Sequence, residues 1–172
     1  LRTAFGGKTV LVLAPGASLA EEAGRSAVAA AKADCIVSAN FCPEFCQPDY
    51  AFFTNSKRFE KLDLAALPCP VVLTSNLGAL AVNYDRLAAP DVQNASLGSN
   101  SVLMLLRLLR LCGAKAVLLA GADGYKPGTP AYADSLLHAH TGRGAAFNAA
   151  MAGAIKACGL DVTFITPSEY AK

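Results

Sequence analysis

The sequence has few charged residues and no long apolar run. Only 16% of its 172 residues are charged and 53% are hydrophobic, the opposite of the balance in a disordered chain. The net charge is +2, and no run of lysine and arginine indicates binding to nucleic acid. No stretch reaches the roughly 18–20 apolar residues of a membrane span, and the N-terminus lacks a signal-peptide pattern. The composition predicts one well-packed domain, residues 1–172.

Cysteine spacing provides no framework for a metal or for disulfides. Of the six cysteines, only Cys42 and Cys46 lie close together in the sequence. A zinc site usually needs two such pairs, or one pair with matched histidines. Disulfide frameworks are typical of small, loop-rich secreted domains, whereas this chain is rich in core residues. We therefore expect reduced thiols in a cytoplasmic protein, with no metal site and no resident cofactor.

The two commonest nucleotide-binding signatures, G-x-G-x-x-G and the G-K-[S/T] of a P-loop, are also absent. A different turn follows the first apolar run. Thr9–Ala14 predicts a strand that Pro15–Gly16 ends, and the capping-box spacing of Ser18 and Glu21 predicts a helix from Leu19. A strand, a glycine turn and a helix start favour an anion at the first N–H groups, although a capped helix without a ligand fits equally well.

Short apolar runs alternate with helical patterns along the chain. Strands are expected at Thr9–Ala14, Cys35–Ala39, Tyr50–Thr54, Pro70–Thr74, Ala116–Ala120 and Leu160–Ile165, with a short edge strand at Leu80–Tyr84. Helices are expected at Leu19–Lys32, Lys57–Leu62, Ser99–Leu111 and Gly144–Cys158, with loops at Arg86–Gly98 and Lys126–His140. This order predicts a Rossmann-like three-layer α/β/α fold with a mostly parallel central sheet, in which ligands bind at the carboxyl ends of the strands.

Polar residues follow several of the expected strands. Asn40, Asn55 and Asn76 each come after an apolar strand, where an amide can read a base or a sugar, or can simply suit a turn. Asp123 lies just past a central strand, where it can orient a sugar hydroxyl or a catalytic group, or form an Asx turn. Ser99–Ser101 opens the most apolar helix, either as its N-cap or as a ligand contact.

The only two histidines, His138 and His140, share one polar loop with Tyr132, Asp134 and Arg143. A histidine with a pKa near its ordinary value of ~6.5 is the commonest general base. A pair of solvated loop histidines is the alternative interpretation. Their i, i+2 spacing beside one carboxylate is weak evidence for a metal site.

Several stretches together resemble a known family. They are VLAPGASL, ANFCPEF, PDYAFFTNSKRF, LMLLRLLRLCGAKAVLLAGADGY and the closing ITPSEY. This series resembles the sialyltransferase-like fold of bacterial family 42 glycosyltransferases. It is more similar to a domain at the C-terminal end of bacterial HMG-CoA-lyase-like or 4-hydroxy-2-oxovalerate-aldolase-like proteins from surface-glycan gene clusters. Because the chain begins with Leu1 rather than methionine, we expect it to be part of a longer protein, and the resemblance implies an aldolase-like barrel before this domain.

The resemblance implies a glycosyltransferase domain that binds a CMP-sugar, such as CMP-sialic acid, and a glycan acceptor in polysaccharide synthesis. It implies that His140 takes the proton of the acceptor hydroxyl while CMP leaves, with no metal. It also implies that Gly16 and Ser18 lie near the donor phosphate, Asn40 near the nucleotide, and Tyr125 or Tyr132 at the phosphate. Together with the strand-end residues, the candidate binding set is Gly16, Ser18, Asn40, Asn55, Asn76, Asn100, Ser101, Tyr125 and Tyr132, and the candidate catalytic pair is His140 and Asp123.

Two loops differ from the sialyltransferase pattern. The first loop reads Pro15–Ser18 instead of Asn-Gly-Pro-Ser, and Asn40-Phe41 replaces an Asn-Gln pair. Proline has no side-chain donor and no backbone N–H with which to hold a sugar donor. A second interpretation is therefore a non-catalytic binding or interaction domain joined to an aldolase-like enzyme. A third is a nucleotide-binding module of another type, which would take ATP.

Overall fold

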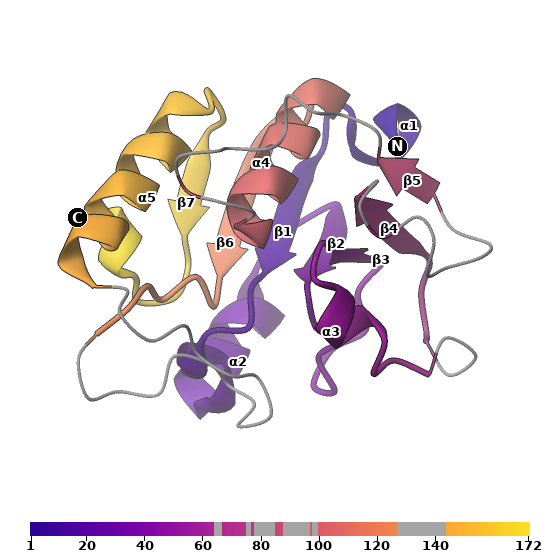
Figure 1. Ribbon diagram of the computed structural model, residues 1–172, viewed down its shortest axis with the longest axis horizontal. Coiled ribbons are helices and arrows are strands. Elements are labelled where there is room, and N and C mark those ends of the chain that lie inside the picture. Colours follow the sequence, from indigo (N-terminus) through magenta and orange to yellow (C-terminus); the bar gives the residue numbers. More distant parts are fainter. Residues whose placement is uncertain (64–66, 75–76, 78–84, 88–96, 98–99, 127–143) are drawn as a thin grey trace.

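The structure is a computed structural model that describes residues 1–63, 67–74, 77, 85–87, 97, 100–126 and 144–172 (Figure 1). Its strands are β1 (Thr9–Leu13), β2 (Cys35–Ala39), β3 (Tyr50–Phe53), β4 (Val71–Thr74), β5 (Asp85–Leu87), β6 (Ala116–Ala120) and β7 (Val162–Phe164). Its helices are α1 (Arg2–Phe5), η1 (Ala17–Ala20), α2 (Glu22–Ala30), α3 (Ser56–Phe59), α4 (Ser101–Cys112), α5 (Ala145–Ala157) and η4 (Glu169–Ala171).

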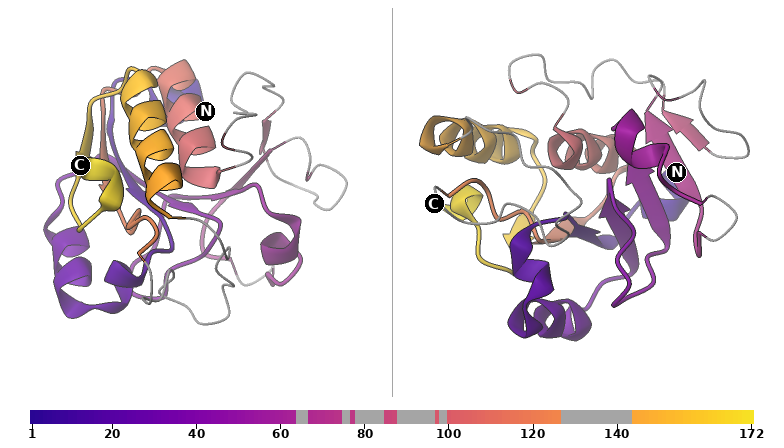
Figure 2. Two further views of the ribbon diagram at one scale, coloured as in Figure 1. Left: turned by 60° about the vertical axis from the view of Figure 1, so that its left-hand side comes forward. Right: turned by 60° about the horizontal axis from the view of Figure 1, so that its bottom comes forward.

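The seven described strands form one sheet in the order β5-β4-β3-β2-β1-β6-β7. Every neighbouring pair is parallel. Helices α4 and α5 lie on one side of the sheet and α2 lies on the other (Figure 2). The expected Rossmann-like α/β/α architecture is confirmed, because strands that alternate with helices are joined by crossovers that bury both faces of a parallel sheet.

Alternate residues of β1 face two separate cores. Val10 and Val12 pack in the cluster that contains the buried side chains of α4, while Leu11 and Leu13 pack with Val28 of α2. Successive side chains of a strand point to opposite faces, so a strand covered on both faces needs apolar residues at every position. This requirement explains why the first apolar run is continuous.

Helix α4 is largely buried between its neighbours and has a defined start and end. Asn100 is its N-cap, and the Asn100 Oδ1 accepts a hydrogen bond from the Leu103 backbone N–H at 3.1 Å. Gly113 ends the helix with a left-handed φ of 78°. The sequence predicted that Ser99–Ser101 opens this helix, and the N-cap was one of its two interpretations.

The segment after β1 corrects one prediction. The capping box was wrong, because α2 begins at Glu22, and Ser18 lies in the short 3-10 helix η1 that precedes it. The Ser18 hydroxyl does not cap α2 but donates to the carboxylate of Asp123, 105 positions further along the chain. The Ser18 hydroxyl thus donates to a charged tertiary acceptor instead of accepting from a local backbone N–H, as a capping box would require.

Two further differences concern short elements. Strand β5, Asp85–Leu87, overlaps the Arg86–Gly98 segment that we expected to be a loop, because its pairing with β4 is a non-local contact without a local pattern. Helix α1 was not predicted, since four residues are too few to show a period. The edge strand expected at Leu80–Tyr84 lies outside the described residues.

No helix in the described part of the chain is both long and apolar enough to cross a membrane.

The strand order reverses between β1 and β6. From β1 the chain continues to β2, β3, β4 and β5 on one side, whereas β6 and β7 are added on the other side. In a doubly wound sheet the crossovers on the two sides of such a point leave the sheet in opposite directions, which opens a crevice outside the carboxyl ends of the two strands. A ligand site is therefore expected at the carboxyl ends of β1 and β6.

Candidate functional site

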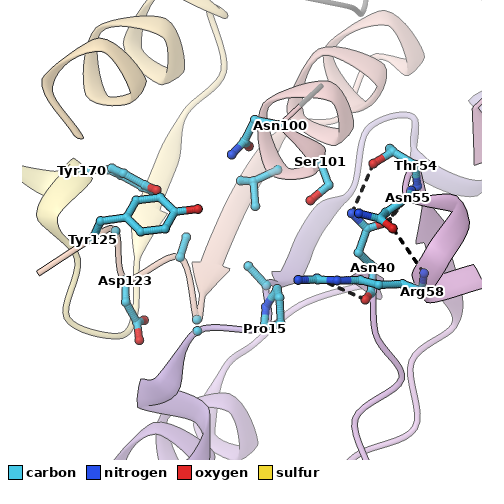
Figure 3. A pocket seen from close by; sticks show the side chains of 16 residues that line it. Pro15, Asn40, Thr54, Asn55, Arg58, Asn100, Ser101, Asp123, Tyr125 and Tyr170 are labelled. Carbon is cyan, nitrogen blue, oxygen red and sulfur yellow. Dashed lines mark hydrogen bonds between the residues drawn. The ribbon is translucent and has the colours of Figure 1, made fainter. Parts of the chain in front are cut away.

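A cavity lies at the carboxyl ends of β1 and β6, where the strand order reverses. It is lined by residues that follow β1, β2, β3 and β6, by the start of α4 and by the C-terminal segment: Ala14, Pro15, Gly16, Asn40, Thr54, Asn55, Arg58, Asn100, Ser101, Val102, Gly121, Ala122, Asp123, Gly124, Tyr125 and Tyr170. Figure 3 shows two sides of different character, amides and a guanidinium on one and tyrosine rings on the other. This is the usual ligand position in a doubly wound sheet.

The carboxylate of Asp123 is bound entirely by Ser18. One oxygen accepts from the Ser18 backbone N–H at 2.7 Å and the other accepts from the Ser18 hydroxyl at 2.6 Å. Ser18 itself is buried and is not among the residues that line the cavity. The turn after β1 thus binds a carboxylate of the protein itself, not a ligand.

Two glycines permit the close approach of the turns after β1 and β6. The Gly16 N–H donates to the Gly121 carbonyl at 2.7 Å. A Cβ atom on Gly16 would lie 2.1 Å from that carbonyl oxygen and 2.6 Å from the Asp123 Cγ. A Cβ atom on Gly121 would lie 2.0 Å from the Ala14 carbonyl oxygen, and its φ of 69° already favours glycine. Both positions require glycine for the Asp123–Ser18 contact to form.

The C-terminal segment holds the turn Gly121–Asp123 from the other side. The Thr166 Oγ1 accepts from the first N–H of this turn at 2.9 Å, and the Ser168 hydroxyl donates to its second carbonyl. The Glu169 N–H donates to its third carbonyl at 2.8 Å. These contacts bring Tyr170, which is buried, to the edge of the cavity. The closing residues of the chain are therefore part of the site.

Asn40 joins the ends of β2 and β3 on the opposite side. Its backbone has a left-handed φ of 58°, a conformation that asparagine tolerates better than most residues. Its Oδ1 accepts from the Thr54 N–H at 2.8 Å and from the Asn55 N–H at 3.3 Å, and its Nδ2 donates to the Thr54 Oγ1 at 3.1 Å. The amide of Asn40 thus builds the wall of the cavity.

Asn55 and Asn100 each cap a helix and line the cavity. The Asn55 Oδ1 accepts from the Arg58 N–H at 3.2 Å, which makes Asn55 the N-cap of α3. The Nδ2 atoms of Asn55 and Asn100 make no hydrogen bond to a described residue. Each cap therefore leaves an amide donor for a ligand.

Tyr125 is held in place by α5. The Asn148 side chain accepts from the Tyr125 N–H at 3.0 Å and donates to the Tyr125 carbonyl at 2.8 Å. The Tyr125 ring packs edge-on against Phe147, with 5.4 Å between the ring centroids. A side chain fixed in this way can present its hydroxyl to a ligand without a large loss of entropy.

The structure brings most of the candidate residues to one cavity. Seven of them line it: Gly16, Asn40, Asn55, Asn100, Ser101, Asp123 and Tyr125. Ser18 lies behind the wall, bound to Asp123. Asn76, Tyr132 and His140 lie outside the described residues, as does His138.

Thr54, Arg58, Val102 and Tyr170 are among the lining residues that the sequence did not predict. Thr54 and Arg58 belong to PDYAFFTNSKRF and Tyr170 belongs to ITPSEY, two of the stretches that carry the family resemblance. Their place in those stretches was the available signal. Thr54 also ends an apolar run and Val102 belongs to a buried helix, so their local patterns indicated only core positions.

The cysteines offer no nucleophile to the site. All six are free thiols, and none lines the cavity. Burial, with a smaller contribution from Cys69, raises the pKa of the Cys42 thiol to about 11. At neutral pH it is a protonated thiol, which is a poor nucleophile and a poor metal ligand. Among the described residues, no three side chains of the metal-binding types come together.

Comparisons of the chain with models of protein families, with curated proteins and with solved structures found no match.

Replacement of Gly16 by alanine tests the close approach of the two turns. We expect Gly16→Ala to lower the free energy of unfolding by about 1–3 kcal/mol, because its Cβ would overlap backbone and carboxylate atoms. Gly153→Ala is the control, since no atom lies within 4 Å of its Cβ, and there alanine should stabilise α5 by about 0.5–1 kcal/mol. Urea unfolding measures both. Equal effects of the two changes would contradict the steric argument.

The pH dependence of stability tests the burial of Asp123. Desolvation raises the pKa of Asp123 above its ordinary value, although the hydrogen bonds from Ser18 oppose the shift. The folded protein then holds this proton more tightly than the unfolded chain, so the contribution of Asp123 to stability falls as the pH rises above about 4. The free energy of unfolding of the wild type minus that of Asp123→Asn should therefore decrease between pH 4 and pH 7. Other groups cancel in this difference. A difference that increases with pH would mean that the Ser18 hydrogen bonds dominate.

Proposed function

We propose that this domain binds a CMP-sugar and takes part in the transfer of its sugar during surface polysaccharide synthesis. The observation that carries the proposal is the cavity where the strand order reverses, lined by amides, a helix start and tyrosines. The sequence resemblance to family 42 glycosyltransferases supplies the identity of the ligand.

The polar groups of the cavity match the parts of a nucleotide sugar. The Nδ2 atoms of Asn55 and Asn100 can donate to acceptor atoms of a base or a sugar. Ser101 is the first residue of α4, where backbone N–H groups and the helix dipole favour a phosphate. Tyr125 can donate its hydroxyl to the same phosphate.

The proposed reaction is a direct displacement. The acceptor hydroxyl attacks the anomeric carbon, its proton passes to His140, and the bond between that carbon and the phosphate oxygen breaks. CMP leaves with the electron pair. Donors near the phosphate, from Tyr125 and the start of α4, stabilise the charge that develops on it. The role of His140 rests on the resemblance.

One observation favours a second candidate function, a non-catalytic binding domain attached to an aldolase-like enzyme. In the resembling sialyltransferases, the first loop holds the sugar donor. Here that loop presents Pro15, and the N–H and hydroxyl of Ser18 are both used by Asp123. The loop therefore contributes fewer donor contacts than the family pattern requires.

Ligand binding tests the proposal that both candidates share. CMP at about 100 times its Kd should raise the free energy of unfolding by about 2.7 kcal/mol. Tyr125→Phe should weaken CMP binding by up to about tenfold, because it removes one hydrogen bond to a charged group. Tyr50→Phe is the matched control, since Tyr50 packs against Phe5 and does not line the cavity. If neither CMP nor CMP-sialic acid stabilises the protein and ATP does, the third interpretation is correct.

The loss of His140 separates catalysis from binding. For a general base, His140→Gln should slow release of CMP from CMP-sialic acid at least about 100-fold and leave the affinity for CMP unchanged. His138→Gln, two positions away, is the control and should retain the wild-type rate. A wild-type protein that binds CMP but releases none from CMP-sialic acid, with any tested acceptor, would be the non-catalytic domain.

A further inference from the structure

Three of the described asparagines line the cavity, and the protein uses their amides in two different ways. The Asn40 amide is bound at both ends, because its oxygen accepts from the Thr54 N–H and its nitrogen donates to the Thr54 Oγ1. In Asn55 and Asn100 only the oxygen is bound, and the nitrogen donates to no residue in the described part of the chain. Asn40 therefore builds the wall, whereas the other two amides keep donors that can act on a ligand.

Helix capping sets the orientation of these two amides. A backbone N–H can donate to an amide oxygen but not to an NH₂ group. The Arg58 N–H at 3.2 Å and the Leu103 N–H at 3.1 Å therefore each fix the place of one amide oxygen, and the nitrogen occupies the other branch of the amide. Figure 3 shows Asn55 and Asn100 in the lining of the cavity, with Ser101 between them in this view. Each amide thus presents donors to the cavity, while its acceptor serves the helix.

Fixed donors of this kind discriminate between ligand groups. Asn55 and Asn100 are half-buried, so a ligand that fills the cavity takes their NH₂ groups away from water. A ligand oxygen without a hydrogen replaces the lost water contact. A ligand group that can only donate leaves the NH₂ group unpaired, which costs more than a matched hydrogen bond gains. A site built in this way rejects ligands that lack the matching group.

The turn after β6 adds to this polarity. It contributes the Asp123 carboxylate to the lining, and the Ser18 N–H and hydroxyl that could have bound a ligand oxygen already donate to that carboxylate. A phosphate or carboxylate placed beside Asp123 would be repelled by it. The acceptor groups of a ligand are therefore directed away from Asp123 and toward the two capping amides.

We propose that the capping amides of Asn55 and Asn100 select the ligand by its hydrogen-bond acceptors, the oxygens of a phosphate, a carboxylate or a carbonyl group. This inference deepens the proposed function and rests on it for the choice of nucleotide-sugar probes. The polarity of the amides rests on the two helix caps alone.

Two replacements at each position separate the cap from the donor. Serine and aspartate are both good N-caps, so Asn55→Ser, Asn55→Asp, Asn100→Ser and Asn100→Asp should keep the urea midpoint of the wild type. All four remove the amide donors, and the two changes to aspartate also place a negative oxygen where the nitrogen was. Gln47→Glu is the matched control, because it converts a carboxamide to a carboxylate at an exposed residue that does not line the cavity.

Titration calorimetry with cytidine, CMP, inorganic phosphate, sialic acid and CMP-sialic acid measures the effect. Asn55→Ser and Asn100→Ser should each weaken binding of the probe that contacts the amide by about tenfold, because one hydrogen bond to a ligand oxygen is lost. The changes to aspartate should weaken it further, and Gln47→Glu should change it by less than about twofold. A loss with phosphate and CMP assigns the amide to the phosphate, a loss with the two sialic acid probes alone assigns it to the carboxylate, and a loss with cytidine assigns it to the nucleoside.

Two outcomes would overturn the proposal: folded Asn55→Asp and Asn100→Asp proteins that bind every probe as tightly as Gln47→Glu does, or a wild-type protein that binds none of the probes. If one replacement at a position does not fold, the other replacement there decides. Binding of CMP that depends on neither amide would reject this inference and leave the CMP-sugar function standing. Binding of phosphate or sialic acid that depends on an amide, without binding of CMP, would do the reverse.

Discussion

The two hydrogen bonds between Ser18 and Asp123 connect the strand ends on which the site depends. They join the turn after β1 to the turn after β6, at the point where the strand order reverses. The close approach requires Gly16 and Gly121, since a Cβ at either position would overlap backbone atoms. The C-terminal segment then binds the second turn through Thr166. One contact thus positions the floor of the cavity.

The same contact changes how the cavity can bind a ligand. The carboxylate of Asp123 already occupies the turn after β1, whereas the start of α4 lines the cavity with helix N–H groups that favour an anion. The amides that line this side also cap helices or join strands, as Asn40 and Asn55 do. Residues with such structural roles are preorganised, because their rotamers are set before a ligand arrives.

Much of the fold was predictable from local patterns. Strands β2 and β6 have the bounds expected from their apolar runs, and Asn100, in the segment expected to open the most apolar helix, is its N-cap. Local patterns gave the wrong prediction where a residue's partner lies far away in the sequence. Ser18 had a local cap spacing but binds Asp123 instead, and β5 exists through its pairing with β4.

The sequence by itself determined six of the seven described strands, the glycine turn after β1 and the three-layer class, because periodicity and turn chemistry act over a few residues. It also predicted a ligand site at the strand ends, where the cavity lies. Only the tertiary structure decided which anion the first turn holds, and that Arg58 and Tyr170 join the cavity. These outcomes depend on contacts between residues far apart in the chain, such as Ser18 and Asp123 at a separation of 105, and no local pattern specifies them.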